Sequence, residues 1–313
     1  MPNVDMRDGM IAALIRAAEQ GVDLIVVVSD STSTSRITPF RERFPGRVVD
    51  VGIAEQNLVG VAVGLSLGGH VAVTANAAPF LVARANEQVK NDVCYSQTNV
   101  KLVGLNAGVA YGALASTHHA IDDISIMRGF GDILIFAPAD VVEAERIFAF
   151  ALDYVGPVYI RMDSVPLPVI HDEDYRFEAG RVELVRPGKE LTIACLGSIL
   201  HEALRAVDDL EKVGISAEVL NISSVRPLDK KGLSEPIART GRIITVEEHS
   251  LHGGLGSLVA EIVAEQGLRA YVRRLGIPEG EFAKAGPRQE IRAFFGFDWQ
   301  GIVASAKELM DRS

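Results

Sequence analysis

The sequence has 313 residues, of which 48% are hydrophobic and 23% are charged, and its formal net charge is −10. This composition is typical of a soluble globular protein that is long enough for two domains with ordinary cores. The negative charge excludes a general nucleic-acid or anionic-membrane surface but leaves room for a local basic pocket that binds a phosphate. No apolar run approaches the roughly 20 residues of a membrane-spanning helix.

The first residues, MPNVDMRDGM, lack the basic region and apolar core of a secretory signal. Cys94 and Cys195 have no metal-ligand spacing, and we expect them in the cores of different domains. Reduced cysteines of this kind predict a cytoplasmic location.

The first half of the chain alternates helices with short apolar strands. Strands are predicted over residues 24–28, 48–51, 70–74, 101–106, 133–136 and 158–161. Helices are predicted over residues 7–20, 55–67, 81–95, 121–128 and 141–154. Continuous apolar strands are typical of parallel sheets that are covered on both faces. The pattern therefore predicts a doubly wound, mostly parallel α/β domain over residues 1–165.

The alternation is interrupted over residues 166–190. Pro166, Pro168 and the acidic run 172–174 predict a linker, followed by a short extended segment over residues 182–185. Alternating strands and helices resume over residues 191–313, and two amphipathic helices end the chain. We therefore expect a second, smaller α/β domain over residues 191–313.

The predicted helix 55–67 is apolar or small on nearly every face, so we expect it to be buried on all sides. Gly60, Gly64 and Gly68 recur every fourth residue, which indicates close approach of another backbone. Glu55 is the one carboxylate of its first turn. It either favours the positive end of the helix dipole or faces a ligand.

Other polar and aromatic residues follow the predicted strands. The hydroxyl-rich segment 29–36 comes after strand 24–28, at the sheet edge where open α/β proteins bind ligands, although capping serines in a solvated loop have the same composition. Phe80 follows strand 70–74 and is either a core residue or part of that edge. His118 and His119 are adjacent and lack a third ligand at metal-site spacing. Dinucleotide, Walker, nucleophile-elbow and zincin motifs are absent from the sequence.

Three segments carry a family resemblance. Residues 50–57 (DVGIAEQN), 78–80 (APF) and 116–118 (STH) together resemble the C-terminal half of transketolases, and the resemblance spans nearly the whole chain. It implies a pyrimidine-binding domain followed by the transketolase C-terminal domain. It also implies that Glu55 would hydrogen-bond N1′ of the thiamine diphosphate aminopyrimidine and that Phe80 would stack on this ring. By the same resemblance, Asp30 lies near the cofactor and His118 contacts the sugar.

The resemblance also assigns the substrate side of the site. Arg7, Ser33 and Arg161 match groups that bind the terminal phosphate of the substrate. Asn106 stands at the position of a substrate-facing histidine, and Leu114 replaces the usual aspartate before the motif histidine. Ala83 and Asn86 replace aromatic residues that line the cofactor. These departures predict an intact outline of the cofactor site and an altered sugar specificity.

The sequence contains no Gly-Asp-Gly run, the motif with which thiamine diphosphate enzymes hold Mg²⁺ and the diphosphate. We therefore expect a partner, an N-terminal transketolase subunit with Gly-Asp-Gly, in an α2β2 assembly with thiamine diphosphate and Mg²⁺.

The predicted function is transfer of a two-carbon ketol unit from an anionic ketose to an aldose. Two alternatives remain open at this point, the β subunit of a 2-oxo acid dehydrogenase decarboxylating component and a non-catalytic α/β binding protein.

Overall fold

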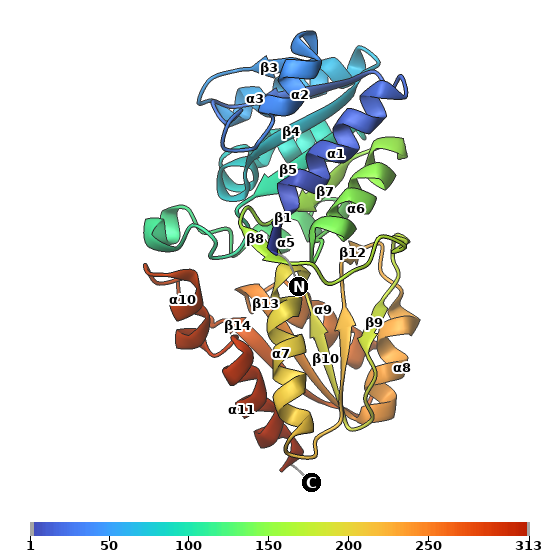
Figure 1. Ribbon diagram of the computed structural model, residues 1–313, viewed down its shortest axis with the longest axis vertical. Coiled ribbons are helices and arrows are strands. Elements are labelled where there is room, and N and C mark those ends of the chain that lie inside the picture. The colour runs from blue at the N-terminus through green and yellow to red at the C-terminus, as the bar shows by residue number, and fades with distance from the viewer. Residues whose placement is uncertain (1–2, 312–313) are drawn as a thin grey trace.

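The computed structural model describes residues 3–311. It has two mostly parallel sheets, which lie one above the other along the long axis of the molecule (Figure 1). In spatial order, the seven strands of the first sheet are β12 (Ser224–Arg226), β6 (Leu134–Phe136), β7 (Val158–Arg161), β5 (Val100–Leu105), β4 (Val71–Ala77), β2 (Leu24–Val28) and β3 (Val48–Asp50). All of its pairings are parallel except that of β12 with β6.

The second sheet has five strands. Their spatial order is β14 (Tyr271–Ile277), β13 (Arg242–Ser250), β10 (Leu191–Cys195), β11 (Ala217–Asn221) and β9 (Glu183–Arg186), with β9 antiparallel. A small antiparallel pair, β1 (Asn3–Asp5) with β8 (Pro166–Pro168), ties the start of the chain to the segment after β7. The predicted α/β architecture is therefore confirmed.

Helices cover both faces of the first sheet. One face carries α1 (Met6–Glu19), α2 (Thr38–Arg43) and α6 (Val141–Asp153). The other carries α3 (Glu55–Leu67), η2 (Phe80–Arg84), α4 (Asn86–Gln88), η3 (Val89–Tyr95) and α5 (Asp123–Arg128). Gly9 lets α1 lie directly on α6, since an added Cβ would overlap the Val141 carbonyl oxygen. Such covering helices explain why the strands read as continuous apolar runs.

The second sheet is covered in the same way. Its helices are α7 (Leu200–Glu211), α8 (Lys230–Thr240), α9 (Leu255–Glu265), α10 (Arg288–Phe295) and α11 (Trp299–Met310). The sequence pattern did not predict α2, α8 or β12. Short or polar helices such as α2 and α8 lack a strong apolar period, and β12 is defined by its pairing with a distant strand.

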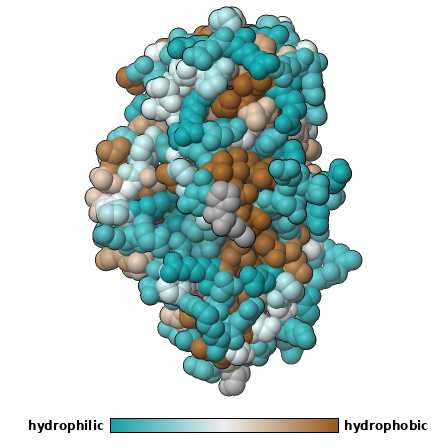
Figure 2. Space-filling model, in the orientation of Figure 1, coloured by the Kyte–Doolittle hydropathy of each residue, from teal (hydrophilic) through white to brown (hydrophobic). Residues whose placement is uncertain are grey.

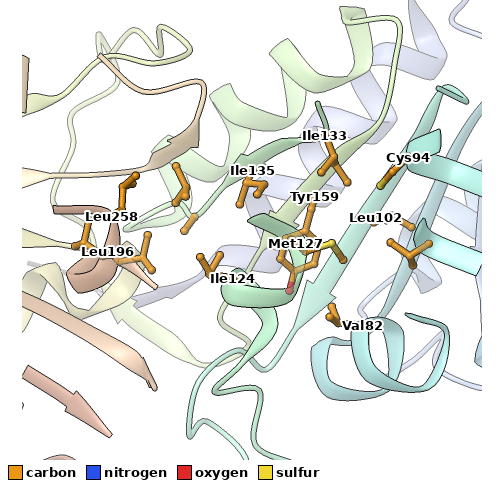
Figure 3. Close-up of a cluster of buried hydrophobic side chains, with 14 of the residues drawn as sticks. Val82, Cys94, Leu102, Ile124, Met127, Ile133, Ile135, Tyr159, Leu196 and Leu258 are labelled. Atoms are coloured by element: carbon orange, nitrogen blue, oxygen red, sulfur yellow. The ribbon is translucent and has the colours of Figure 1, made fainter. Parts of the chain in front are cut away.

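The two sheets share one apolar core across the domain junction. Ile124, Met127 and Ile135 lie on the first-sheet side of this core, and Leu196 and Leu258 lie on the other (Figure 3). On the face seen in Figure 1, hydrophobic surface also gathers near the middle of the molecule (Figure 2). Within residues 3–311, no helix is both long and apolar enough to cross a membrane.

The helix α3 has the predicted bounds, but its predicted burial on every side is wrong for the single chain. Leu58, Val59 and Ala62 are buried, whereas Gly60 and Gly64 are exposed with no atom within 4 Å of an added Cβ. Leu67 is 76% exposed on the same helix. The small residues of α3 therefore leave one side of the helix uncovered, and no other backbone of the described chain approaches it at Gly60 or Gly64.

An ion network also joins the two domains. The His171 ring lies between two carboxylates, with Nδ1 3.0 Å from Oδ2 of Asp140 and Nε2 3.0 Å from Oε2 of Glu183. Burial disfavours the charged imidazole, but Asp140 and Glu183 overcome this effect and raise the pKa of His171 to about 10. Ligand atoms of Glu143, His171 and Glu183 lie within 4.8 Å of one another. The imidazolium supplies the positive charge that these carboxylates need.

This network predicts a pH-dependent stability. Because folding raises the pKa of His171, this residue stabilises the fold fully at pH values below its unfolded-state pKa near 6.5. This stabilisation is lost as the pH rises through about 10. Urea unfolding should show that the free energy of unfolding decreases by an amount on the order of 3 kcal/mol over this pH range, and the decrease should be absent from His171→Gln. His70→Gln, which removes an exposed pair with Asp23, is the control and should retain the decrease. Parallel pH curves for wild type and His171→Gln would contradict the prediction.

Candidate functional site

Two loops at the carboxyl edge of the first sheet place Glu55. The Ser29 hydroxyl, after β2, donates to the Gly52 carbonyl oxygen at 2.7 Å and accepts from the Ala54 N–H at 3.1 Å. Oδ1 of Asp50 accepts from the backbone N–H groups of Asp30 and Gly52 at 2.9 and 3.0 Å. The loop after β2 is thus joined to the turn that starts α3, which fixes the first residue of that helix.

Glu55 begins α3 and is only 4% exposed. Its Oε2 accepts a hydrogen bond of 2.7 Å from Nη1 of Arg84, at the end of η2. A buried carboxylate needs a compensating charge or hydrogen bonds, and Arg84 provides both. The side chain of Arg84 is itself 49% exposed, so this charge pair sits at the edge of the interior.

Aromatic rings continue the site away from Glu55. The Arg84 guanidinium carbon lies 4.6 Å from the centroid of the Phe80 ring. The His118 ring meets Phe80 edge to face at 5.1 Å between centroids and meets Tyr111 at 5.4 Å. Nδ1 of His118 lies 3.0 Å from the Thr117 hydroxyl. Glu55, Phe80 and His118, which the sequence predicted as site residues, therefore lie in one continuous row.

Tyr111 extends this row toward the substrate-side residues. Burial raises the pKa of Tyr111, while a hydrogen bond between its side chain and that of Asn106, together with the nearby Arg7 charge, opposes the shift. Asn106 follows β5 and its backbone N–H donates to the Ser164 hydroxyl at 3.2 Å. Asn106 and Arg7 are thus near the same row through Tyr111.

Two predicted anion ligands are engaged by carboxylates of their own chain. Arg7 donates from Nε and Nη2 to Asp5, and it also donates to the carbonyl oxygens of Thr34 and Ser164. Arg161 is buried and donates from Nε to both carboxylate oxygens of Asp123, with a further bond of 2.8 Å to the Glu248 carbonyl oxygen. These bonds leave Nη1 of Arg161 without a hydrogen bond inside residues 3–311.

Ser33 and Asp30 lie on the exposed loop after β2. Ser33 lines a surface cleft of about 370 Å³ together with Asp8, Ile11, Arg36, Thr38 and Pro39. Asp30 has φ +51°, Asn106 has φ +55° and Ala115, close to His118, has φ +60°. Residues other than glycine adopt this conformation at a cost, and such strain clusters at functional sites.

The C-terminal domain supports the loop that carries His118. The hydroxyl of Ser116, in η4 (Gly112–Thr117), donates to the Ala283 carbonyl oxygen at 2.8 Å. An added Cβ on Gly112 would lie 2.8 Å from the Gly286 carbonyl oxygen, so the two loops are in close contact. Both domains therefore position the site. His119 is turned away and lies near the Gly112 carbonyl oxygen, 3.2 Å from its Nε2.

The sequence pattern did not predict Arg84 or Tyr111 as site residues. Arg84 follows Phe80 by four residues on a helical segment, the spacing at which side chains share a face, and this signal was available. The segment η2 is a π-helix, a form that occurs frequently at functional sites. Tyr111 carries no comparable signal, because its contact with His118 depends on the fold of η4.

A buried carboxylate and an aromatic ring at the carboxyl edge of a parallel sheet form a site that can bind a flat, hydrogen-bonding heterocycle, so the chain belongs to the class of proteins that bind such a ligand. Comparison with known proteins identifies the family. The model of the transketolase pyrimidine binding domain matches residues 2–167, and that of the transketolase C-terminal domain matches residues 180–302.

Individual relatives agree with these matches. The chain is 52% identical over 300 residues, 96% of both chains, to one subunit of the apulose-4-phosphate transketolase of Actinobacillus succinogenes. It is 34% identical to the 6-deoxy-6-sulfo-D-fructose transketolase subunit SqwH of Clostridium sp., covering 98% of this chain and 95% of the relative. A solved split gene transketolase, described as an inactive beta4 tetramer, superposes with a TM-score of 0.88 at 34% identity and covers 98% of both chains.

The chain therefore belongs to the transketolase family. It corresponds to the C-terminal half of a split transketolase, a transferase whose family uses thiamine diphosphate. The alternatives of a 2-oxo acid dehydrogenase component and a non-catalytic binding protein are not favoured by these relatives.

Proposed function

We propose that this chain forms, with a second polypeptide, a transketolase that moves a two-carbon ketol unit from a phosphorylated ketose to an aldose. The observation that supports this role best is the row from Glu55 through Phe80 to His118. The Arg84 guanidinium, a flat hydrogen-bonding group, already fits between the Glu55 carboxylate and the Phe80 ring, so this space suits an aminopyrimidine. Bound thiamine diphosphate would supply the electron sink for the transfer.

The residues of this chain would then have distinct tasks. Glu55 would hold a proton at N1′ of the pyrimidine, and Phe80 would orient the ring by stacking on it. His118 would contact the sugar from the far side of Phe80, with Asn106 near it and Asp30 at the cofactor edge. Arg7, Ser33 and Arg161 would hold the anionic tail, and Arg161 would do so through Nη1.

The proposal assigns the diphosphate and Mg²⁺ to an N-terminal subunit with a Gly-Asp-Gly motif, in an α2β2 complex. The absence of that motif from this sequence and the exposed face of α3 support a second chain. The 52% identical relative is named as one subunit of its enzyme, and the beta4 tetramer is described as inactive, which also supports a second chain.

Apulose 4-phosphate is the donor that we propose, because the 52% identical relative acts on it according to its name. The 34% identical relative is named for a sulfonated ketose, so the ketoses in the names of both relatives carry a negatively charged tail. The replacements at Asn106 and Leu114 favour a donor other than the ordinary pentose phosphate.

The test is a reconstituted pair with thiamine diphosphate and Mg²⁺, assayed with apulose 4-phosphate, 6-deoxy-6-sulfo-D-fructose and xylulose 5-phosphate. We expect kcat/KM for apulose 4-phosphate to exceed that for xylulose 5-phosphate by at least about tenfold. Unphosphorylated apulose is the control for the tail charge. A preference for xylulose 5-phosphate would refute the proposed donor, and no transfer from any ketose would refute the proposed activity.

A further inference from the structure

Arg84 occupies the space that the proposed cofactor ring requires. Its Nη1 donates to Oε2 of Glu55 at 2.7 Å, and its guanidinium carbon lies 4.6 Å from the Phe80 ring centroid. The aminopyrimidine would need the same carboxylate for a hydrogen bond and the same ring for stacking. A pyrimidine that binds Glu55 and Phe80 on the side where Arg84 now lies would have to displace the guanidinium, so the two groups compete for this position.

The position of Arg84 in the chain allows it to leave. Its side chain is half-exposed, and it is the last residue of the π-helical segment η2, next to Ala85 at φ −95° and ψ +24°. A guanidinium released from Glu55 would therefore enter water rather than a closed interior. Contacts of this kind at the protein surface are weak enough for a ligand to displace.

Glu55 also explains why a cation lies there before the cofactor arrives. The carboxylate is almost fully buried, and Arg84 is the charged partner that contacts it within the described chain. In this contact Oε2 of Glu55 accepts from Nη1 of Arg84, whereas the proposed catalytic role has the Glu55 carboxylate bonded to N1′ of the pyrimidine. The cofactor-free and cofactor-bound forms of the site therefore require different positions of Arg84.

We propose that Arg84 is a latch, a side chain that covers the pyrimidine subsite of the cofactor-free chain and swings out when the cofactor binds. This inference rests on the proposed function, because it assumes that Glu55 and Phe80 receive the pyrimidine. Arg84 acts through Glu55 and is a positioning residue. Its removal tightens cofactor binding because the competing contacts no longer have to be broken.

The experiment measures binding rather than turnover. Isothermal titration of thiamine diphosphate, with Mg²⁺ present, into the assembled pair gives Kd for wild type and for Arg84→Met, which keeps the length of the side chain and removes its charge. We expect a Kd about fivefold to tenfold lower for Arg84→Met. In a Glu55→Gln background, which removes the negative charge that holds Arg84, the same substitution should change Kd by less than about twofold.

Arg205→Met is the matched control. Arg205 is an exposed arginine that lies 4.0 Å over the Trp299 ring in the C-terminal domain, away from Glu55. Its replacement removes a cation–π contact of the same kind and should leave Kd unchanged.

The outcomes separate the latch from the function on which it rests. An unchanged or higher Kd for Arg84→Met, with normal binding by the wild-type pair, would overturn the latch and leave the proposed function standing. Failure of the wild-type pair to bind thiamine diphosphate would overturn both. If Arg84→Met did not fold, Arg84→Gln would take its place, since glutamine at a half-exposed helical position retains a polar surface.

Discussion

Replacement of Glu55 by glutamine should slow exchange of the thiazolium C2 proton of bound thiamine diphosphate by about 10²–10⁴-fold, the usual range of general acid–base catalysis. Glutamine keeps the shape of the side chain and can form hydrogen bonds, but it cannot take up or release the proton at N1′. Exchange is followed by NMR after quenching in D₂O, and turnover should decrease with it. The chain should still fold, because Arg84 loses only one partner and its half-exposed guanidinium remains hydrated.

Glu87→Gln is the matched control for this prediction. Glu87 lies three residues beyond Arg84 and is exposed, so its replacement removes the same charge from the same region without touching the row of Glu55, Phe80 and His118. Assembly of each variant with the partner chain is verified by size-exclusion chromatography. Wild-type exchange in an assembled Glu55→Gln complex would show that Glu55 is a structural residue and remove the main support of the proposed activity.

Gly60→Leu should stabilise the isolated chain and prevent its assembly. Gly60 lies inside α3 with no atom within 4 Å of an added Cβ, and leucine favours a helix interior over glycine by about 1 kcal/mol. If the exposed side of α3 packs on another chain, however, the leucine occupies space that small residues keep clear. Two overpacked copies in a symmetric complex should weaken assembly by at least about a hundredfold. Urea unfolding measures the first effect and analytical ultracentrifugation with the partner chain the second.

Gly46→Leu is the control, because Gly46 is exposed and an added Cβ there also meets no atom within 4 Å. It lies on η1 (Pro45–Arg47), away from α3, and should leave assembly intact. Normal assembly and cofactor binding of Gly60→Leu would place the interface elsewhere on the chain.

The sequence by itself determined most of the fold. The bounds of β2, β7 and α3 agree with the prediction residue for residue, because continuous apolar runs and breaks at glycine indicate which segments are covered on both faces. The residues of the family motifs, Glu55, Phe80 and His118, are far apart in the chain yet lie together. The carboxyl ends of parallel strands meet at one edge, so their neighbourhood follows from topology.

The tertiary structure decided what each of these groups contacts. Arg7 and Arg161 pair with Asp5 and Asp123, and Arg84 with Glu55; only the contact of Arg7 with Asp5 is close in sequence. A sequence pattern records that a side chain is charged, whereas its partner depends on where the backbone places both groups. The predicted burial of Gly60 and Leu67 was wrong for the same reason. An apolar helix face has the same sequence pattern whether it packs inside its own chain or against another chain. Only the folded structure shows that this face of α3 is not covered by its own chain.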